Sequence, residues 1–201
     1  MPLRLSLLAS NWYDWLIAAL WIILVAYWVI SAASAKRTIS GGWVWWREIG
    51  LRLVLLGLVL VVLRLTGSNG ALAKAGIYLV NRNMLLGLIG AVLCALGVGL
   101  AIWARVYLGR NWDMAMSRKE NPDMVTTGPY AYVRHPIYAG FLLAMLGSAI
   151  GQSVIWLVML IVTGVYFTFA ARREEMNMLE QFPEQYRTYK ERTKMLVPFI
   201  W

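Results

Sequence analysis

Residues 84–106 read MLLGLIGAVLCALGVGLAIWARV, an apolar run whose only charged residue is Arg105, near its end. A helix needs about 17–25 predominantly apolar residues to cross a bilayer. This run is therefore predicted to be a membrane-spanning helix, and it decides the fold class. Four further apolar runs cover residues 15–31, 49–65, 136–150 and 154–171. We predict an all-α, polytopic membrane bundle of about five transmembrane helices.

The composition supports membrane insertion of the whole chain. Of the 201 residues, 60% are hydrophobic, which is more apolar surface than a soluble domain of this length needs. Residues 15–31 form a longer apolar run than the core of a signal peptide, so we expect a retained helix. The chain contains no linker-like or repetitive stretch. We therefore expect one integral-membrane domain, residues 1–201, with membrane helices in residues 1–104.

The basic residues predict the orientation. Most of the 19 Lys and Arg fall after the first, third and fifth runs, and cytoplasmic loops carry such an excess. We expect a cytoplasmic C-terminus, with the protein in the plasma (inner) membrane. This bias and attraction to anionic lipid account for the net charge of +9. No basic stripe carries a nucleic-acid-binding motif, so nucleic acid is not an expected partner.

Small residues predict close helix packing. Gly87, Ala91, Ala95 and Gly99 recur at four-residue spacing in the third run, and residues 140, 144 and 148 do so in the fourth. Such stripes let helix backbones approach closely in lipid. Cys94 is the only cysteine and is expected to be a packing residue, since one cysteine and one histidine cannot form a zinc site. No metal site is predicted.

The only histidine stands at the start of the fourth run, in the sequence RHPIY of residues 134–138. Pro136 suits the first turn of a helix and holds His135 in an extended conformation just before it. His135 and Tyr138, three residues apart, can present their rings to one ligand. The helix start also favours an anionic group. The alternative is that Pro136 only starts a membrane helix and His135 caps it.

A second polar cluster follows the fifth run. Apolar and aromatic residues recur at helical spacing after Glu174 and Glu175. They predict amphipathic helices that lie against the membrane face and are broken at Pro183. A hairpin at residues 147–153 would return the chain to the side it left, so Glu174 can approach His135. Residues 110–134 are expected to be a cytoplasmic loop. Loop and tail would then roof a polar pocket near the lipid headgroups.

Taken in order, these segments resemble the isoprenylcysteine carboxyl methyltransferase family and its bacterial relatives, which are membrane enzymes that use S-adenosylmethionine. The similar stretches are residues 108–112, 125–130, 134–140 and 174–175, together with Tyr186, Tyr189, Arg192 and residues 198–199. The resemblance covers about residues 105–201. It implies that these residues form the cofactor-binding, catalytic half of the protein. As an ordered set the match is specific.

The resemblance implies the site residues. The family pattern places around the methyl donor Met124, Val125, Tyr130, His135, Pro136, Ile137, Tyr138 and Glu174. The prenylcysteine enzymes carry a substrate-binding arginine where this chain has Ala170, so Arg172 and Arg173 are the nearest candidates, of which we assign Arg172 to the substrate. The pattern also departs at Pro122, where relatives often have a histidine. Glu175 is expected to form at most an exposed ion pair, and no catalytic acid or base is assigned.

We therefore predict a membrane methyltransferase that moves a methyl group from S-adenosylmethionine to a lipophilic acceptor by direct displacement. The acceptor atom, in a carboxylate, thiol or amine, stays open, as does the oligomeric state. Expected partners are the lipid bilayer and a lipophilic small molecule or lipidated acceptor. Two alternatives remain: an NADPH-dependent membrane oxidoreductase similar to sterol reductases, and a non-catalytic membrane protein.

Overall fold

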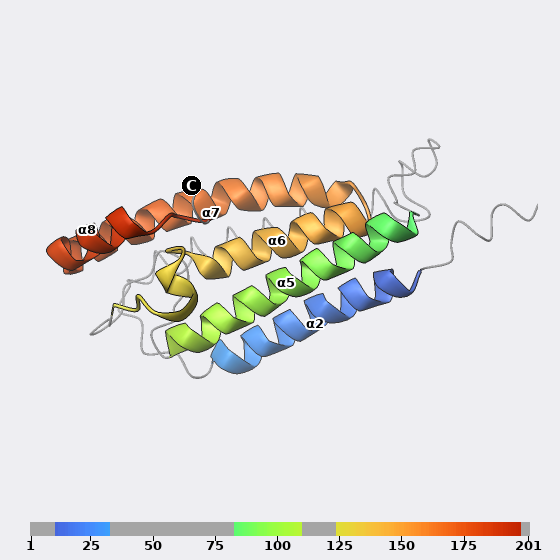
Figure 1. The fold of residues 1–201 in the computed structure, drawn as a ribbon, viewed down its shortest axis with the longest axis horizontal. Coiled ribbons are helices and arrows are strands. Elements are labelled where there is room, and N and C mark those ends of the chain that lie inside the picture. The colour runs from blue at the N-terminus through green and yellow to red at the C-terminus, as the bar shows by residue number, and fades with distance from the viewer. Residues whose placement is uncertain (1–10, 33–82, 110–123, 198–201) are drawn as a thin grey trace, which may run out of the picture.

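The computed structural model describes residues 11–32, 83–109 and 124–197, and every structural statement below concerns these ranges. Their elements are α2 (Trp12–Ala32), α5 (Met84–Leu108), the 3-10 helix η2 (Gly128–Ala131), α6 (Pro136–Gly151), α7 (Ile155–Gln181) and α8 (Pro183–Arg192) (Figure 1). No strand occurs in these ranges, where Val133 and Lys194 form an isolated parallel bridge. The all-α prediction is confirmed.

Four of the five predicted apolar runs form helices, and the remaining one, residues 49–65, lies outside the described residues. In the described part of the chain, α2, α5 and α7 are long and apolar enough to cross a membrane. The fourth, α6, is a shorter apolar helix of 16 residues. The protein is therefore an integral membrane protein of helical architecture.

Helices α2, α5, α6 and α7 lie side by side, and the polar segments lie at one end of the bundle (Figure 1). The C-terminal ends of α2, α5 and α7 lie at this end, where α6 begins and where η2 and α8 also lie. At the opposite end, residues 152–154 connect α6 to α7. The predicted hairpin is confirmed, although α6 continues to Gly151, so the turn starts later than expected.

Glycines bring α5 and α6 into backbone contact. A side chain at Gly90 or Gly97 of α5 would overlap the backbone of α6, and one at Gly140 or Gly147 of α6 would overlap the backbone of α5. Both pairs are spaced by seven residues, which places each pair on one face of its helix. This close approach replaces side-chain packing with backbone contact, as small residues do in membrane helices.

The predicted stripe on α5 was only partly right. Ala95 and Gly99 are exposed, and Gly87 faces the ring of Tyr13 in α2 instead of α6. The reason is that α5 packs against two neighbours with different faces, which a single four-residue spacing does not separate. Cys94 is fully buried in the hydrophobic core between these faces, as predicted for a packing residue.

Polar contacts join α2 to both of its neighbours, α6 and α5. Trp21 of α2 donates a hydrogen bond from its indole Nε1 to Ser148 Oγ of α6, at 3.0 Å. Arg105, whose side chain is buried, donates from Nη2 to the Ser31 carbonyl at 2.6 Å and from Nη1 to the Gly109 carbonyl at 2.7 Å. Carbonyls at the last turn of a helix have no partner within the helix, so Arg105 satisfies the ends of both α2 and α5.

The polar segment after the fifth apolar run continues α7 without a break as far as Gln181. The expected interruption at Pro183 is confirmed, because Phe182 ends α7 and Pro183 opens α8. The residues before Pro183 do not form a separate amphipathic helix, since nothing in residues 172–181 stops the helix. Glu174 and Glu175 are therefore fixed on a rigid extension of a membrane helix, and α8 folds back beside it (Figure 1).

Candidate donor site at the polar end of the bundle

The backbone fixes His135 at the start of α6. Pro136 occupies the first helical position, and His135 precedes it with φ −125° and ψ 61°. The His135 N–H donates to the Met195 carbonyl at 3.0 Å, and the His135 carbonyl accepts from the Ala139 N–H at 3.1 Å. The imidazole makes no capping hydrogen bond to the helix. His135 is therefore the N-cap residue of α6 through its backbone carbonyl, whereas its side chain takes no part in the cap.

His135, Tyr138 and Glu174 form one cluster. The rings of His135 and Tyr138 stack with centroids 5.5 Å apart and an interplanar angle of 5°. The Tyr138 hydroxyl donates to Glu174 Oε1 at 2.5 Å, and His135 Nδ1 lies 3.4 Å from Glu174 Oε2. On its other side the Tyr138 ring stacks on Phe167 of α7, at 4.3 Å. The hairpin thus brings Glu174 to His135, as its topology predicted.

The two glutamates control the charge of His135. Burial alone would lower the pKa of the imidazole, but contacts with Glu174 and Glu175 outweigh it and raise the pKa above 6.5. Nε2 lies 3.5 Å from Glu175 Oε1 and has no hydrogen-bond partner in the described part of the chain. The side chain of His135 is only 10% exposed. Both ring nitrogens of the buried imidazole therefore face a glutamate carboxylate.

The prediction for Glu175 was wrong. Its side chain is 3% exposed, against 28% for Glu174. Arg134 Nε lies 2.6 Å from Glu175 Oε1, and Lys190 Nζ lies 2.9 Å from Glu175 Oε2. Consecutive residues on a helix point about 100° apart. Because of this rotation, Glu174 points toward Tyr138. Glu175 instead points toward Arg134 and Lys190, with which it forms a buried ion cluster beneath α8.

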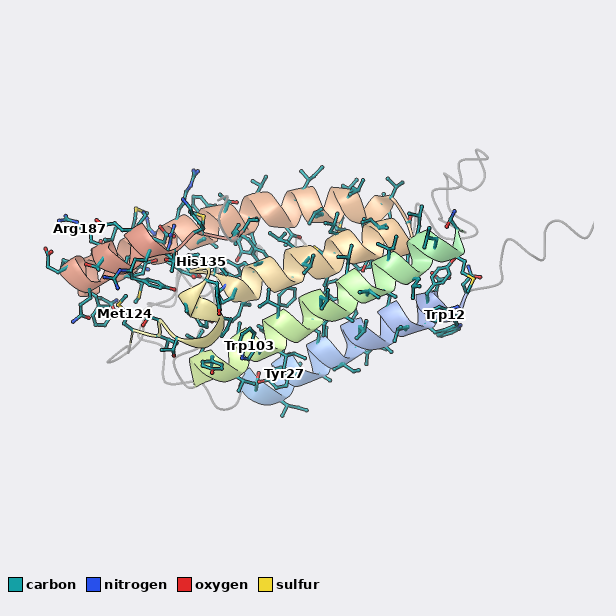
Figure 2. All side chains as sticks on the ribbon, in the orientation of Figure 1. Trp12, Tyr27, Trp103, Met124, His135 and Arg187 are labelled. Carbon is teal, nitrogen blue, oxygen red and sulfur yellow. The ribbon has the colours of Figure 1, made fainter. Side chains whose placement is uncertain are left out.

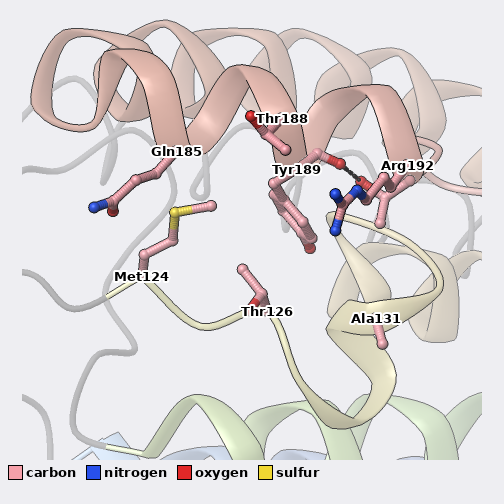
Figure 3. Close-up of a pocket in the computed structure, with 8 residues that line it drawn as sticks. Met124, Thr126, Ala131, Gln185, Thr188, Tyr189 and Arg192 are labelled. Atoms are coloured by element: carbon pink, nitrogen blue, oxygen red, sulfur yellow. Dashed lines mark hydrogen bonds between the residues drawn. The ribbon is translucent and has the colours of Figure 1, made fainter.

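A pocket lies between α8 and the segment that leads into η2 (Figure 3). Its volume is about 430 Å³. Polar and apolar side chains share the lining, which consists of Met124, Thr126, Ala131, Gln185, Thr188, Tyr189, Arg192 and Thr193. The loop and α8 therefore line a pocket at this end of the bundle, but His135, Tyr138 and Glu174, where the pocket was predicted, are not among its lining residues.

The sequence-predicted residues of the loop lie in or beside this pocket. Met124 lines it, and Figure 2 shows Met124 at the same end of the bundle as His135. Val125 is half-buried. Tyr130 is buried, and its carbonyl accepts a hydrogen bond from the Tyr189 hydroxyl at 2.6 Å. Burial raises the pKa of Tyr189 to about 12, so that hydroxyl remains a proton donor at neutral pH.

The other predicted residues divide into two groups. Pro136 is fully buried and Ile137 is half-buried, both in the first turn of α6. Arg172 is exposed on α7, and neither the His135 cluster nor the pocket lining includes it. Ala170, at the position of the substrate-binding arginine of the prenylcysteine enzymes, is fully buried. The role predicted for Arg172 therefore has no contact to support it.

Sequence reasoning missed the lining that α8 supplies. Gln185, Thr188, Tyr189 and Arg192 line the pocket. Their spacing of three, four and seven residues places them on one helical face. That polar periodicity is present in the sequence, but the prediction used only the helical spacing of the apolar and aromatic residues, of which Tyr189 alone lines the pocket. Thr193 follows α8, and no pattern signalled it.

Comparison with known proteins now identifies the family. The family model for phospholipid methyltransferases matches residues 85–185, from the first turn of α5 into α8. The chain belongs to the phospholipid methyltransferase family. The resemblance to the isoprenylcysteine carboxyl methyltransferases is confirmed by relatives at the level of sequence.

Two curated relatives of this family member differ in their acceptors. The protein-S-isoprenylcysteine O-methyltransferase of Schizosaccharomyces pombe is 33% identical over 52% of this chain and 46% of its own length. Methanethiol S-methyltransferase 1 of Bradyrhizobium diazoefficiens is 36% identical over 39% of this chain and 27% of its own length. The chain therefore spans less than half the length of either relative.

A solved structure shares the fold of this family member. A eukaryotic intramembrane Ras methyltransferase, isoprenylcysteine carboxyl methyltransferase, superposes with a TM-score of 0.56 over 74% of this chain and 53% of its own. The sequences are 23% identical, so the likeness concerns the fold. It supports the helical membrane architecture described above.

Proposed function

We propose that this protein is an integral-membrane methyltransferase that transfers a methyl group from S-adenosylmethionine to a lipophilic acceptor. The observation that carries the proposal is the His135–Tyr138–Glu174 cluster, in which two stacked rings and a partly exposed carboxylate meet at the polar end of a membrane hairpin. Family membership supports the reaction class. The acceptor and the activity of the whole protein are part of the proposal.

The donor fits the chemistry of these residues. Glu174 can accept hydrogen bonds from ribose hydroxyls or from the donor's ammonium group. The carboxylate of Glu174, which is partly exposed, also attracts the positive charge of the donor's sulfonium. The first turn of α6 presents backbone N–H groups and a positive dipole end to the donor's carboxylate.

The proposed reaction needs alignment more than acid–base chemistry. When bound, S-adenosylmethionine supplies an electrophilic methyl group on a positively charged sulfur. His135, Tyr138 and Glu174 would hold the donor beside the apolar ring of Phe167. Such positioning can supply roughly 7–11 kcal/mol of a barrier. A site without an assigned catalytic base is consistent with this chemistry.

The acceptor is proposed to approach from the membrane side of the cluster. Phe167 stacks on Tyr138 and contacts Phe141 edge to face, with centroids 6.1 Å apart. These rings extend the cluster along α6 and α7 into the apolar part of the bundle. They offer a lipophilic acceptor an aromatic surface, while the water-soluble donor reaches the cluster from the cytoplasm. The excess of Lys and Arg on one side supports a cytoplasmic C-terminus, and we propose the plasma (inner) membrane as the location.

Calorimetry of the detergent-solubilised protein with S-adenosylhomocysteine and with NADPH tests the proposal. We expect saturable binding of S-adenosylhomocysteine and none of NADPH. Binding of NADPH alone would replace the methyltransferase with a reductase similar to sterol reductases. Binding of neither ligand by folded protein would leave a non-catalytic membrane protein as the better description.

A further inference from the structure

The C-terminal segment is paired with the backbone that enters α6. Val133 and Lys194 form a parallel bridge. The Arg134 N–H donates to the Lys194 carbonyl at 2.8 Å, and the His135 N–H donates to the Met195 carbonyl at 3.0 Å. The residues that follow α8 therefore hold the backbone of His135 directly. Any displacement of this segment would remove a hydrogen bond from the histidine of the donor cluster.

A cluster of ionic side chains also holds residues 193–195 in place. Arg134 Nε donates to Glu175 Oε1 at 2.6 Å, and its Nη1 donates to the Thr193 carbonyl and, at 3.4 Å, to the Lys190 carbonyl. Lys190 Nζ lies 2.9 Å from the second carboxylate oxygen of Glu175. One guanidinium and one carboxylate thus connect three elements, namely the entry to α6, the end of α7 and the end of α8.

This fastening also shapes the pocket. Thr193, whose carbonyl accepts from Arg134, lines the pocket together with Tyr189. The Tyr189 hydroxyl donates to the Tyr130 carbonyl at 2.6 Å, which joins the α8 wall of the pocket to η2. The position of α8 therefore sets both a wall of the pocket and the backbone of His135.

Glu175 is not placed to contact a ligand itself. Its side chain is 3% exposed, and each carboxylate oxygen already faces a cationic side chain. Glu174, its neighbour, is 28% exposed and lies against Tyr138. Buried ion pairs of this kind are weak evidence for stability, because desolvation offsets much of the attraction, but they can fix a unique arrangement of elements.

We propose that Glu175 and Arg134 are positioning residues, which hold α8 and residues 193–195 against the start of α6 and so form the donor site. The proposal rests on the function proposed above, and it assigns these two residues no contact with the donor. It predicts that their loss weakens donor binding by releasing the tail, while the membrane bundle remains folded.

The first test compares Glu175→Gln with Glu184→Gln. Glu184 is on α8 and its side chain is 89% exposed, so its variant controls for the loss of one negative charge near the tail. For each protein, calorimetry measures the affinity for S-adenosylhomocysteine and hydrogen exchange measures protection of residues 183–197. We expect Glu175→Gln to weaken binding roughly tenfold or more, a tenfold change being about 1.4 kcal/mol. Exchange should rise in residues 183–197 and at His135, but not in α5.

A tether supplies the rescue. Val133→Cys with Lys194→Cys, in a Cys94→Ala background, would place two thiols on neighbouring backbone segments about 4.8 Å apart, within the range a disulfide spans. When the disulfide is formed, the affinity of Glu175→Gln for S-adenosylhomocysteine should differ by less than about threefold from that of the tethered protein that keeps Glu175. This corresponds to a difference below about 1 kcal/mol. Reduction of the disulfide should restore the defect. A merely destabilised variant would not respond to the tether in this way.

Three results would overturn the proposal. The first is weaker binding by Glu175→Gln without a change in tail exchange, which would indicate direct contact with the ligand. The second is faster tail exchange with unchanged affinity. The third is loss of protection throughout the bundle, which would make Glu175 a general stabilising residue. If the Glu175 parent itself fails to bind S-adenosylhomocysteine, the proposed function fails, and the exchange measurements still decide whether this carboxylate holds the tail.

Discussion

The Tyr138 hydroxyl donates a hydrogen bond of 2.5 Å to Glu174 Oε1, across the interface between α6 and α7. This contact orients the carboxylate beside the stacked rings of His135 and Tyr138. Short hydrogen bonds to an ionised group are among the stronger ones in proteins. Glu174 is therefore held in one orientation while 28% of its side chain remains accessible, which suits a carboxylate that receives a ligand.

We predict that Glu174→Gln weakens the affinity for S-adenosylhomocysteine by about 1.5–3 kcal/mol, the typical contribution of a hydrogen bond to a charged group. Titration calorimetry of the purified variant measures the change. Glu184→Gln is the matched control, because it removes an exposed carboxylate at the same end of the bundle. Equal affinities for Glu174→Gln and the control would remove Glu174 from the donor site.

The pH dependence of stability should depend on His135. The pKa of this imidazole is raised above 6.5 in the folded protein, because Glu174 and Glu175 outweigh the effect of burial. Its protonation therefore stabilises the fold fully below the unfolded value of about 6.5, and that contribution is lost as pH rises through the folded pKa. We expect the unfolding temperature to fall over this window. His135→Asn should flatten the decline.

The difference between the two pH profiles isolates the histidine from other titrating groups. Thermal unfolding in detergent, followed by tryptophan fluorescence from about pH 6 to about pH 9, supplies both profiles. Parallel profiles for the parent and His135→Asn would show that the glutamates do not stabilise a charged imidazole.

The sequence predicted where the helices lie better than it predicted which side chains each helix buries. Hydropathy located four of the described helices because lipid requires long apolar runs, and Pro136 marked a helix start because it fixes φ and needs no N–H donor. The buried state of Glu175 was not predictable in this way. It depends on Arg134, 41 residues earlier, and on Lys190 of α8, so only the folded arrangement of the tail reveals it.

The pairing of residues 194–195 with the start of α6 could not be predicted from the sequence either, for a related reason. The bonds from the N–H groups of Arg134 and His135 to the carbonyls of residues 194 and 195 use backbone atoms, which every residue type supplies. No side-chain pattern therefore marks the partner. By contrast, the approach of Glu174 to His135 followed from topology, since an even number of membrane crossings returns a chain to the same side.

The orientation of the protein gives a further prediction. Cysteine introduced at Arg187, on exposed α8, should be labelled from the cytoplasmic side, and cysteine introduced at Asn69 from the opposite side. Arg187 lies at the polar end of the bundle (Figure 2), whereas Asn69 lies outside the described residues. Both substitutions are made in a Cys94→Ala background with a membrane-impermeant thiol reagent. Labelling from one side alone would contradict the five-helix topology derived from the basic residues.

Two glycines of α5 offer a matched test of the helix packing. A methyl group at Gly97 would overlap the backbone of α6 at Ala144, whereas a methyl group at Gly99 meets open space. Gly97→Ala should therefore destabilise the bundle by about 1–3 kcal/mol, the usual cost of overpacking, since backbone cannot move aside as a flexible side chain can. Gly99→Ala should be neutral or stabilising by up to about 1 kcal/mol, because alanine is the better helix former. Reversible unfolding in mixed detergent micelles measures both variants. Similar stabilities would mean that α5 and α6 do not meet through backbone contact at Gly97, and a larger loss at Gly99 would assign the α6 contact to the stripe of Gly87, Ala91, Ala95 and Gly99 after all.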